Sequence, residues 1–144
     1  MDFSFDYDVF QPTAAGTAGD AMDYKVNYEN WISSEYLCPE GVSELKKISG
    51  DEEAIKDAFG AELEFGTAGM RGIIGYGTNR MNVYTVRRAT KGLAEFIKAN
   101  GKAAMQRGVA ISYDTRNKSE LFARAAAGVL LYNDIKVYIY PEPR

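Results

Sequence analysis

The stretch VAISYDTRNKSELFARAAAGVLLYNDIKVYIY, residues 109–140, decides the fold of this chain. It opens with a short apolar run at 109–114 whose residues suit a β-strand and which ends in an aspartate. Residues 119–132 carry apolar side chains at helical spacing, and residues 135–140 alternate as a half-buried strand does. A strand, a helix and a second strand in this order predict two parallel strands joined by a helical crossover.

Helical patterns precede this stretch. Residues 83–100 predict one amphipathic helix, with Asn82 as its N-cap and Gly101 as its C-terminal stop. Residues 28–60 predict short helices, the last of them capped by Asp51, which we interpret as a packing appendage. The expected fold class is therefore α/β: a mixed, largely parallel sheet with helices on both faces, preceded by short helices.

Length and charge narrow the functional classes. A chain of 144 residues with 46% hydrophobic residues fits one domain with a real core. Its net charge of -3 argues against a dedicated nucleic-acid binder, which usually carries a basic surplus. The chain lacks an apolar run long enough for a transmembrane helix, and it begins with acidic and aromatic residues rather than as a signal peptide does. We expect no membrane association, and we interpret residues 1–22, which are rich in small residues, as a flexible arm.

Histidine is absent, and Cys38 is the one cysteine. The absence of histidine excludes Ser-His-Asp and Cys-His catalysis and histidine metal sites within this chain. A single cysteine forms no internal disulfide, which indicates a reducing, cytoplasmic location. Any acid or base chemistry here must use Asp, Glu, Lys, Tyr or Arg.

The stretch FGTAGMRG, residues 65–72, has the parts of a phosphate contact. Glycines let the backbone approach a ligand closely, and successive amide groups form an anion-binding concavity. A guanidinium fork matches a phosphate with two hydrogen bonds. Arg71 and Thr67 are therefore candidate phosphosugar-binding residues, with Gly66 and Gly69 in support. The alternative interpretation is a tight structural turn.

Other motifs are weaker. The chain has no GxxxxGK[ST] loop, and GYGTNR carries Arg80 where a dinucleotide-binding motif would have its third glycine. Asp114 lies at the carboxyl end of a predicted parallel strand, where ligand sites of open α/β sheets lie, and Arg116 follows it closely. The two residues either pair with each other or support the glycine loop. The alternative is a capped turn between a strand and a helix.

Three of these motifs, FGTAGMRG, GTNRMN and YDTR, occur in the order that is typical of one family. With IKVYIYPEPR behind them, they closely resemble the N-terminal domain of phosphoglucomutases and phosphomannomutases, the α-D-phosphohexomutase family. The resemblance covers about residues 28–144, so we interpret 23–144 as domain I of that family. The region around Trp31 and the segment DEEAIKDAF are most similar to the bacterial phosphoglucomutase and eukaryotic phosphopentomutase-like branch.

The resemblance implies a concrete function. Members of the family interconvert hexose 1-phosphate and hexose 6-phosphate through a bisphosphorylated sugar such as glucose 1,6-bisphosphate, using a phosphoserine as donor. Mg²⁺ is held by the phosphoserine and by aspartates of a later domain. The arginine of the family's glycine loop corresponds to Arg71, which would contact the phosphosugar together with Thr67. The implied partners are the phosphosugar and the remaining domains of the mutase.

One departure from the family pattern matters. The family's serine lies in a TASHNP-type loop, which is not found in these 144 residues. The resemblance places that loop beyond Arg144, so we expect a domain cut before its catalytic serine, without metal ligands and inactive by itself. A cut sheet leaves an exposed strand edge, which favours self-association. The alternative is a free-standing module that binds phosphosugars or associates with itself, and the sugar preference stays open between glucose, mannose and pentose.

Overall fold

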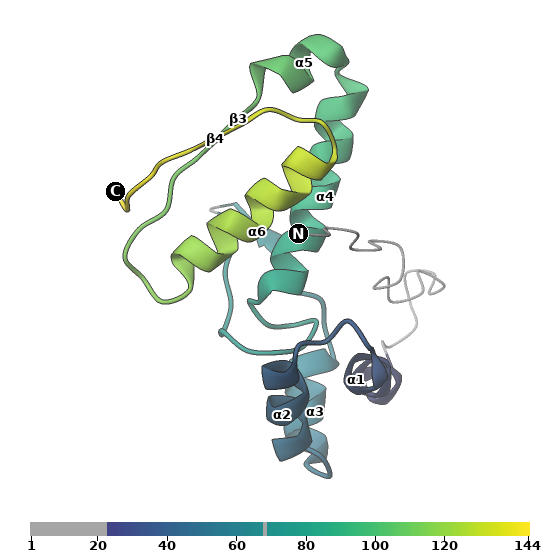
Figure 1. The fold of residues 1–144 in the computed structure, drawn as a ribbon. Helices are drawn as coiled ribbons and strands as arrows, with labels where there is room; N and C mark the ends of the chain where they lie inside the picture. The colour runs from purple at the N-terminus through teal and green to yellow at the C-terminus, as the bar shows by residue number, and fades with distance from the viewer. Residues whose placement is uncertain (1–22, 68) are drawn as a thin grey trace. The chain divides into compact units, whose positions relative to one another are not determined.

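The computed structural model describes residues 23–67 and 69–144. The predicted flexible arm at residues 1–22 lies outside the described residues. The chain divides into two compact units, Met1–Met81 and Asn82–Arg144, and each is described by itself (Figure 1).

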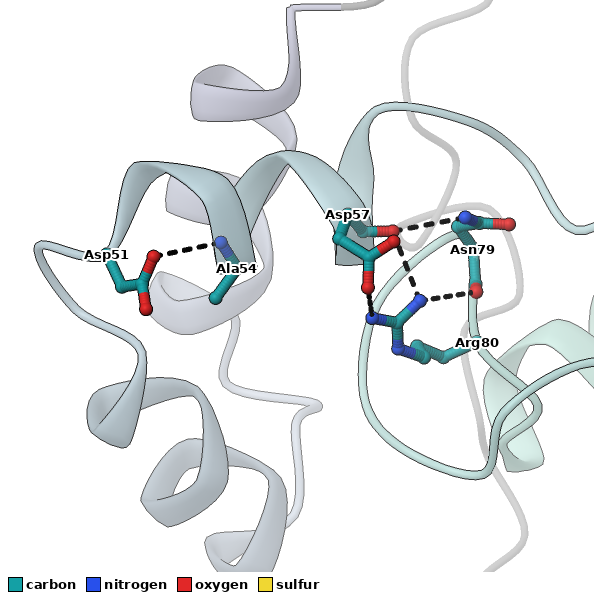
Figure 2. Close-up of polar contacts among 5 residues, drawn as sticks. All are labelled: Asp51, Ala54, Asp57, Asn79 and Arg80. Carbon is teal, nitrogen blue, oxygen red and sulfur yellow. Dashed lines mark hydrogen bonds and ion pairs between the residues drawn. The ribbon is translucent and has the colours of Figure 1, made fainter.

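Three short helices open the described part of the first unit. The prediction of short helices in this region is confirmed, although the first begins earlier than the apolar pattern indicated. The reason is a local cap, because the carboxylate of Asp23 accepts the N–H groups of Lys25 and Val26. Asp51 is also confirmed as a cap, accepting the N–H of Ala54 at 3.0 Å (Figure 2). The helices are α1 (Tyr24–Ser33), α2 (Pro39–Lys47) and α3 (Glu52–Phe59).

The core of this unit forms around Phe59, whose side chain is fully buried at the end of α3. The rings of Tyr28 and Trp31 in α1 meet it edge-on, with centroids 5.7 Å and 5.6 Å away. Such aromatic pairs each stabilise by about 0.5–1.5 kcal/mol beyond the area they bury. The Tyr28 hydroxyl also donates to the carbonyl oxygen of Leu45 at 3.0 Å, which ties α1 to α2. The three helices therefore form a base with its own core.

A short antiparallel hairpin follows the helices. Its strands are β1 (Phe65–Gly66) and β2 (Gly69–Met70), with Phe65 opposite Met70 and Gly66 opposite Gly69. The glycine-rich stretch 62–82 predicts a strand, a loop and a second extended piece, and both extended pieces are present. Glycines supply half of the paired positions and contribute no side-chain packing, which limits the length of the ladder.

The second unit contains one long helix, a strand, a helix and another strand. Asn82 is confirmed as the cap of the long helix, because its side chain accepts the N–H groups of Tyr84 and Thr85 in a capping box. Gly101, at φ 83°, follows the end of that helix as predicted. The helix at 102–107 was not predicted, because six residues are too few to show a periodic pattern. The elements are α4 (Val83–Ala99), α5 (Lys102–Arg107), β3 (Val109–Ile111), α6 (Ser119–Tyr132) and β4 (Val137–Ile139).

The two strands of this unit run parallel and side by side, and α6 connects them along the chain (Figure 1). Val109 pairs with Val137 and Ile111 with Ile139, so the predicted parallel pair with a helical crossover is confirmed. Its buried core joins one residue of α4, one of α6 and one of the turn before β4. These residues are Ala94, Leu130 and Ile135.

Two details at the start of α6 differ from the prediction. Serine favours the cap position, so the sequence predicts Ser119 as the N-cap of this helix. This prediction is wrong, because Lys118 is the cap residue, in a left-handed conformation at φ 61°, and Ser119 is the first helical residue. The strand at 109–114 was expected to be longer, yet β3 ends at Ile111. Beyond it the chain still has a partner, because the Arg144 N–H donates to the carbonyl oxygen of Tyr113 at 2.9 Å.

The α/β class is thus observed, but the larger sheet is not. Within residues 23–67 and 69–144, the strands form two separate two-stranded sheets, one antiparallel and one parallel. A single, largely parallel sheet with helices on both faces is therefore not confirmed. None of the helices in the described ranges has the length and apolar character to cross a bilayer.

Candidate functional site

The glycine hairpin of the first unit brings four of the predicted site residues together. The chain reverses between Gly66 and Gly69, and Thr67 lies exposed in the turn. Gly69 has φ +94°, a left-handed conformation that glycine adopts without strain. A Cβ added at Gly66 would stay 3.5 Å from the nearest atom, an ordinary contact, so the backbone requires glycine at Gly69 rather than at Gly66.

Arg71 follows directly after β2 and is exposed to solvent. Within the described ranges its guanidinium makes no hydrogen bond or ion pair. A guanidinium offers five N–H donors in a fixed fork. Because these donors are not used inside the described chain, they are available to an oxyanion ligand.

The segment that carries Arg71 is held on both sides. The Met81 N–H donates to the carbonyl oxygen of Ile73 at 2.8 Å, and the Gly75 N–H donates to that of Met81 at 3.2 Å. On the other side of the hairpin, the Leu63 N–H donates to the carbonyl oxygen of Thr78 at 2.9 Å. Arg71 therefore lies in a short exposed segment between fixed points of the backbone.

Asp114 and Arg116 form a compact turn in the second unit. The Asp114 carboxylate accepts the backbone N–H of Arg116 at 3.1 Å and its Nε at 2.7 Å, and the Asp114 N–H donates to the Ser119 hydroxyl at 3.2 Å. The Arg116 N–H, then its side chain and Ser119, lower the pKa of the Asp114 carboxyl, because these donors stabilise the charged form. The two residues pair and cap the turn between β3 and α6. Support of the glycine loop by this pair stays a prediction.

Arg80 is a residue whose role sequence reasoning missed. It was noted only as a departure from a dinucleotide-binding motif, but its guanidinium binds the backbone and the carboxylate of Asp57 in α3 (Figure 2). The Arg80 side chain is only 14% exposed. No periodic pattern signals this contact, because the partners are far apart in the chain.

A second group that the sequence did not reveal links α2 to the loop that follows the hairpin. The Tyr76 hydroxyl lies 3.2 Å from the Cys38 sulfur and donates to a carboxylate oxygen of Glu40 at 3.3 Å. Burial, followed by the neighbouring Cys38 and Glu40, raises the pKa of Tyr76 above its ordinary value of 10.0. The phenol is therefore protonated at neutral pH and acts as a hydrogen-bond donor.

A metal site would need several ligand side chains close together in the described part of the chain. Within residues 23–67 and 69–144, no three His, Cys, Asp or Glu side chains gather as a metal-ion cluster.

Comparisons with known proteins give a consistent result. The family model described as phosphoglucomutase/phosphomannomutase, alpha/beta/alpha domain I, matches residues 62–142. Mouse phosphopentomutase is 33% identical over 135 residues, which is 87% of this chain and 22% of that protein. The probable phosphoribomutase of Schizosaccharomyces pombe is 39% identical over 99 residues, covering 69% of this chain and 17% of the relative.

A bacterial relative, phosphoglucomutase of Staphylococcus epidermidis, is 36% identical over 110 residues, covering 76% of this chain and 19% of the relative. No solved structure gave a significant match. The chain thus spans between 17% and 22% of the length of these three relatives. The family match includes the glycine hairpin and the Asp114 turn, whereas α1, α2 and α3 precede it.

Proposed function

This chain belongs to the phosphoglucomutase/phosphomannomutase family, as part of its N-terminal domain, and on this premise we propose that it is the N-terminal part of a phosphosugar mutase. In the proposed enzyme, Arg71 and Thr67 bind a phosphate of the sugar, and the backbone of Gly66 and Gly69 lets the ligand approach. The observation that carries the proposal is the exposed Arg71 guanidinium, which has no polar partner within the described ranges.

The proposed reaction follows from the family. A hexose 1-phosphate and a hexose 6-phosphate are interconverted through glucose 1,6-bisphosphate or its counterpart, with a phosphoserine as the phosphoryl donor. Phosphoryl transfer depends on positioning and on positive groups around the phosphate. We assign one such group, Arg71, to this chain, and we assign the phosphoserine and the Mg²⁺ ligands to the remaining domains of the full-length enzyme. The chain alone is accordingly proposed to bind without turnover.

The sugar itself is a separate question. The relatives carry the names phosphopentomutase, phosphoribomutase and phosphoglucomutase, and a loop that binds phosphate does not read the sugar ring. We therefore propose that this chain contributes phosphate recognition, and that other parts of the enzyme choose between pentose and hexose. The lone Cys38 supports a cytoplasmic location for the enzyme.

A titration tests the role of Arg71. We expect the chain to bind glucose 1,6-bisphosphate saturably in isothermal titration calorimetry. Charge-assisted hydrogen bonds are each worth about 1.5–3 kcal/mol, so Arg71→Gln is expected to weaken binding at least about tenfold. Arg107→Gln is the matched control, because Arg107 is also exposed and has no polar partner within the described ranges. Absence of binding by the unmodified chain, or equal affinity of Arg71→Gln, contradicts the proposal.

A second candidate function is self-association, either in a free-standing module or in the isolated chain. The observation that favours it lies in β4 and the residue after it, where Tyr138 is 51% exposed, Ile139 38% and Tyr140 45%. In the described part of the chain, β4 pairs with β3 alone. An exposed apolar strand with an open edge is a template for pairing with another chain.

A further inference from the structure

We propose that Arg80 is a positioning residue: its contacts with Asp57 hold the segment that carries Arg71 on the C-terminal end of α3. The effect on ligand binding rests on the proposed function of Arg71. The anchoring of the segment rests only on hydrogen bonds and an ion pair within the first unit. It also gives a role to α1, α2 and α3, which precede the family match.

Arg80 contacts the C-terminal end of α3, where backbone carbonyl groups need hydrogen-bond donors. The last four carbonyl groups of an α-helix have no partner within the helix, and that end carries partial negative charge. Arg80 Nη1 donates to the carbonyl oxygen of Asp57 at 3.1 Å, and Asn79 Nδ2 donates to the same oxygen at 3.0 Å (Figure 2). Arg80 Nη2 also forms an ion pair with the Asp57 carboxylate. The guanidinium thus satisfies both a backbone acceptor and a carboxylate at the negative end of α3.

The neighbouring residues complete the cap. The Asn79 N–H donates to the carbonyl oxygen of Ala58 at 2.9 Å, and the Thr78 hydroxyl lies 3.4 Å from the carbonyl oxygen of Phe59. Gly77 has φ +139°, and a Cβ added there would lie 2.4 Å from the Ala58 carbonyl oxygen. The stretch 77–80 therefore serves as a C-terminal cap of α3, and the loop reaches it through a glycine.

The same stretch continues directly to the Arg71 segment. Thr78 accepts the N–H of Leu63 just before β1, and Met81 bonds to Ile73 and Gly75 after β2. The backbone on both sides of the hairpin is thus bonded to residues next to Arg80. A displacement of this stretch would move Arg71, because the residues between Arg71 and these fixed points are few.

The three helices that carry this cap pack around one buried aromatic side chain. Phe59 ends α3 and is held by the edge-on rings of Tyr28 and Trp31. The helices therefore support the stretch 77–80, and this stretch holds the β1–β2 hairpin.

The ion pair and the backbone hydrogen bond of Arg80 are expected to contribute unequally to stability. The Asp57 side chain is 66% exposed, so water screens the ion pair, whereas the Arg80 side chain is only 14% exposed. The bonds from the guanidinium to the backbone carbonyl should therefore matter more than the pairing of charges. Removal of the guanidinium is expected to have a larger effect than neutralisation of Asp57.

Hydrogen exchange measured on the full chain tests the structural part. In Arg80→Met, which keeps the apolar stem, we expect the amides of Leu63, Gly75 and Met81 to exchange at least about tenfold faster, as the loss of a charge-assisted hydrogen bond implies. Asp57→Asn should accelerate them less. The matched control is Glu52→Gln, which removes an ion pair with Lys25, 3.0 Å long, at the opposite end of α3. Unchanged exchange of the three amides in Arg80→Met, in a folded chain, overturns the inference.

A double-mutant cycle tests the positioning of Arg71. If Arg80 acts through Arg71, then Arg80→Met weakens binding of glucose 1,6-bisphosphate about tenfold in the unmodified chain and has no further effect in Arg71→Gln. Arg80→Lys, which keeps the charge but loses the fork, should restore only part of the affinity. Equal effects of Arg80→Met in both backgrounds indicate a general loss of structure and overturn the positioning role. If the unmodified chain does not bind, the proposed function fails, and the exchange of the three amides still decides the structural inference.

Discussion

The guanidinium groups of Arg71 and Arg80 differ in their exposure to solvent and in their partners. Arg71 is exposed and makes no polar contact within the described ranges, whereas Arg80 is largely buried against the end of α3. A guanidinium that is already paired inside the chain has fewer donors left for a ligand. The structure therefore distinguishes an exposed arginine, which we propose to bind the ligand, from a paired one, which we propose to position it.

Gly77 allows a stability prediction at this scale. Gly77→Ala is expected to destabilise the chain by more than about 2 kcal/mol, because the residue combines a positive φ with a backbone oxygen 2.4 Å from the new Cβ. Gly92→Ala is the control, since Gly92 lies in α4 with open space around it, and alanine there should stabilise by about 0.5–1 kcal/mol. Urea unfolding measures both, and equal effects of the two substitutions would show the argument to be wrong.

Asp114 gives a pH prediction. Its pKa is lowered below the ordinary value of 3.8 by the Arg116 N–H, the Arg116 side chain and Ser119. A carboxyl with a lowered folded pKa contributes stability above its unfolded pKa, and this contribution is lost as the pH falls through the folded pKa. Unfolding followed between about pH 5 and pH 2 should therefore show a smaller loss of stability in Asp114→Asn than in the unmodified chain. Parallel curves for the two proteins would contradict this assignment.

At the scale of elements, the helices depend on local caps. Asn82 and Thr85 form a capping box in which the Asn82 side chain accepts the Thr85 N–H at 2.9 Å and the Thr85 hydroxyl accepts the Asn82 N–H at 3.1 Å. These bonds satisfy donors at the start of α4 that would otherwise lack partners. The cap therefore fixes where α4 begins.

Removal of this cap has a measurable consequence. Asn82→Ala is expected to destabilise the chain by about 1–2 kcal/mol, because a cap side chain that is lost leaves N–H groups without partners. Asn82→Ser keeps an oxygen acceptor at the cap and should retain most of the stability. Thermal unfolding followed by circular dichroism distinguishes the two, and a serine variant as unstable as the alanine variant would indicate that the cap is not the cause.

The sequence predicts features that depend on neighbouring residues better than contacts between distant segments. Caps such as Asn82 and Asp51 and the crossover unit at 109–140 depend on neighbours in the chain, so their residues predict them. The contact between Arg80 and Asp57 joins segments that are far apart in the sequence, and no spacing rule connects them. The short α5 was likewise missed, because positive φ angles at its flanking glycines, rather than apolar periodicity, set its ends.

At the scale of the whole molecule, the chain consists of two units with separate cores. One centres on Phe59 among three short helices, and the other on Ala94, Leu130 and Ile135. The family match begins at residue 62 and ends at residue 142, so it includes the hairpin of the first unit and most of the second unit. The helices α1, α2 and α3 therefore precede the segment that the family model matches.

The exposed side chains of β4 carry a prediction for the assembled state. We expect the isolated chain to form dimers or larger species, measured by size-exclusion chromatography with light scattering. Ile139→Lys should reduce them, because a charge on an exposed strand opposes edge pairing. Lys102→Ala, on an exposed residue of α5, is the control. A mass of 15.9 kDa at every concentration, the mass of one chain, would contradict the prediction.

The Thr78 hydroxyl donates to the carbonyl oxygen of Ala61 at 2.7 Å, so the segment from 61 to 78 departs from and returns to a single point. A loop closed in this way can be exchanged as a cassette, because a graft of different content meets the same two attachment points. Transplanting the corresponding segment of a relative onto these helices should therefore change the affinity for phosphate and leave the choice of sugar unaltered.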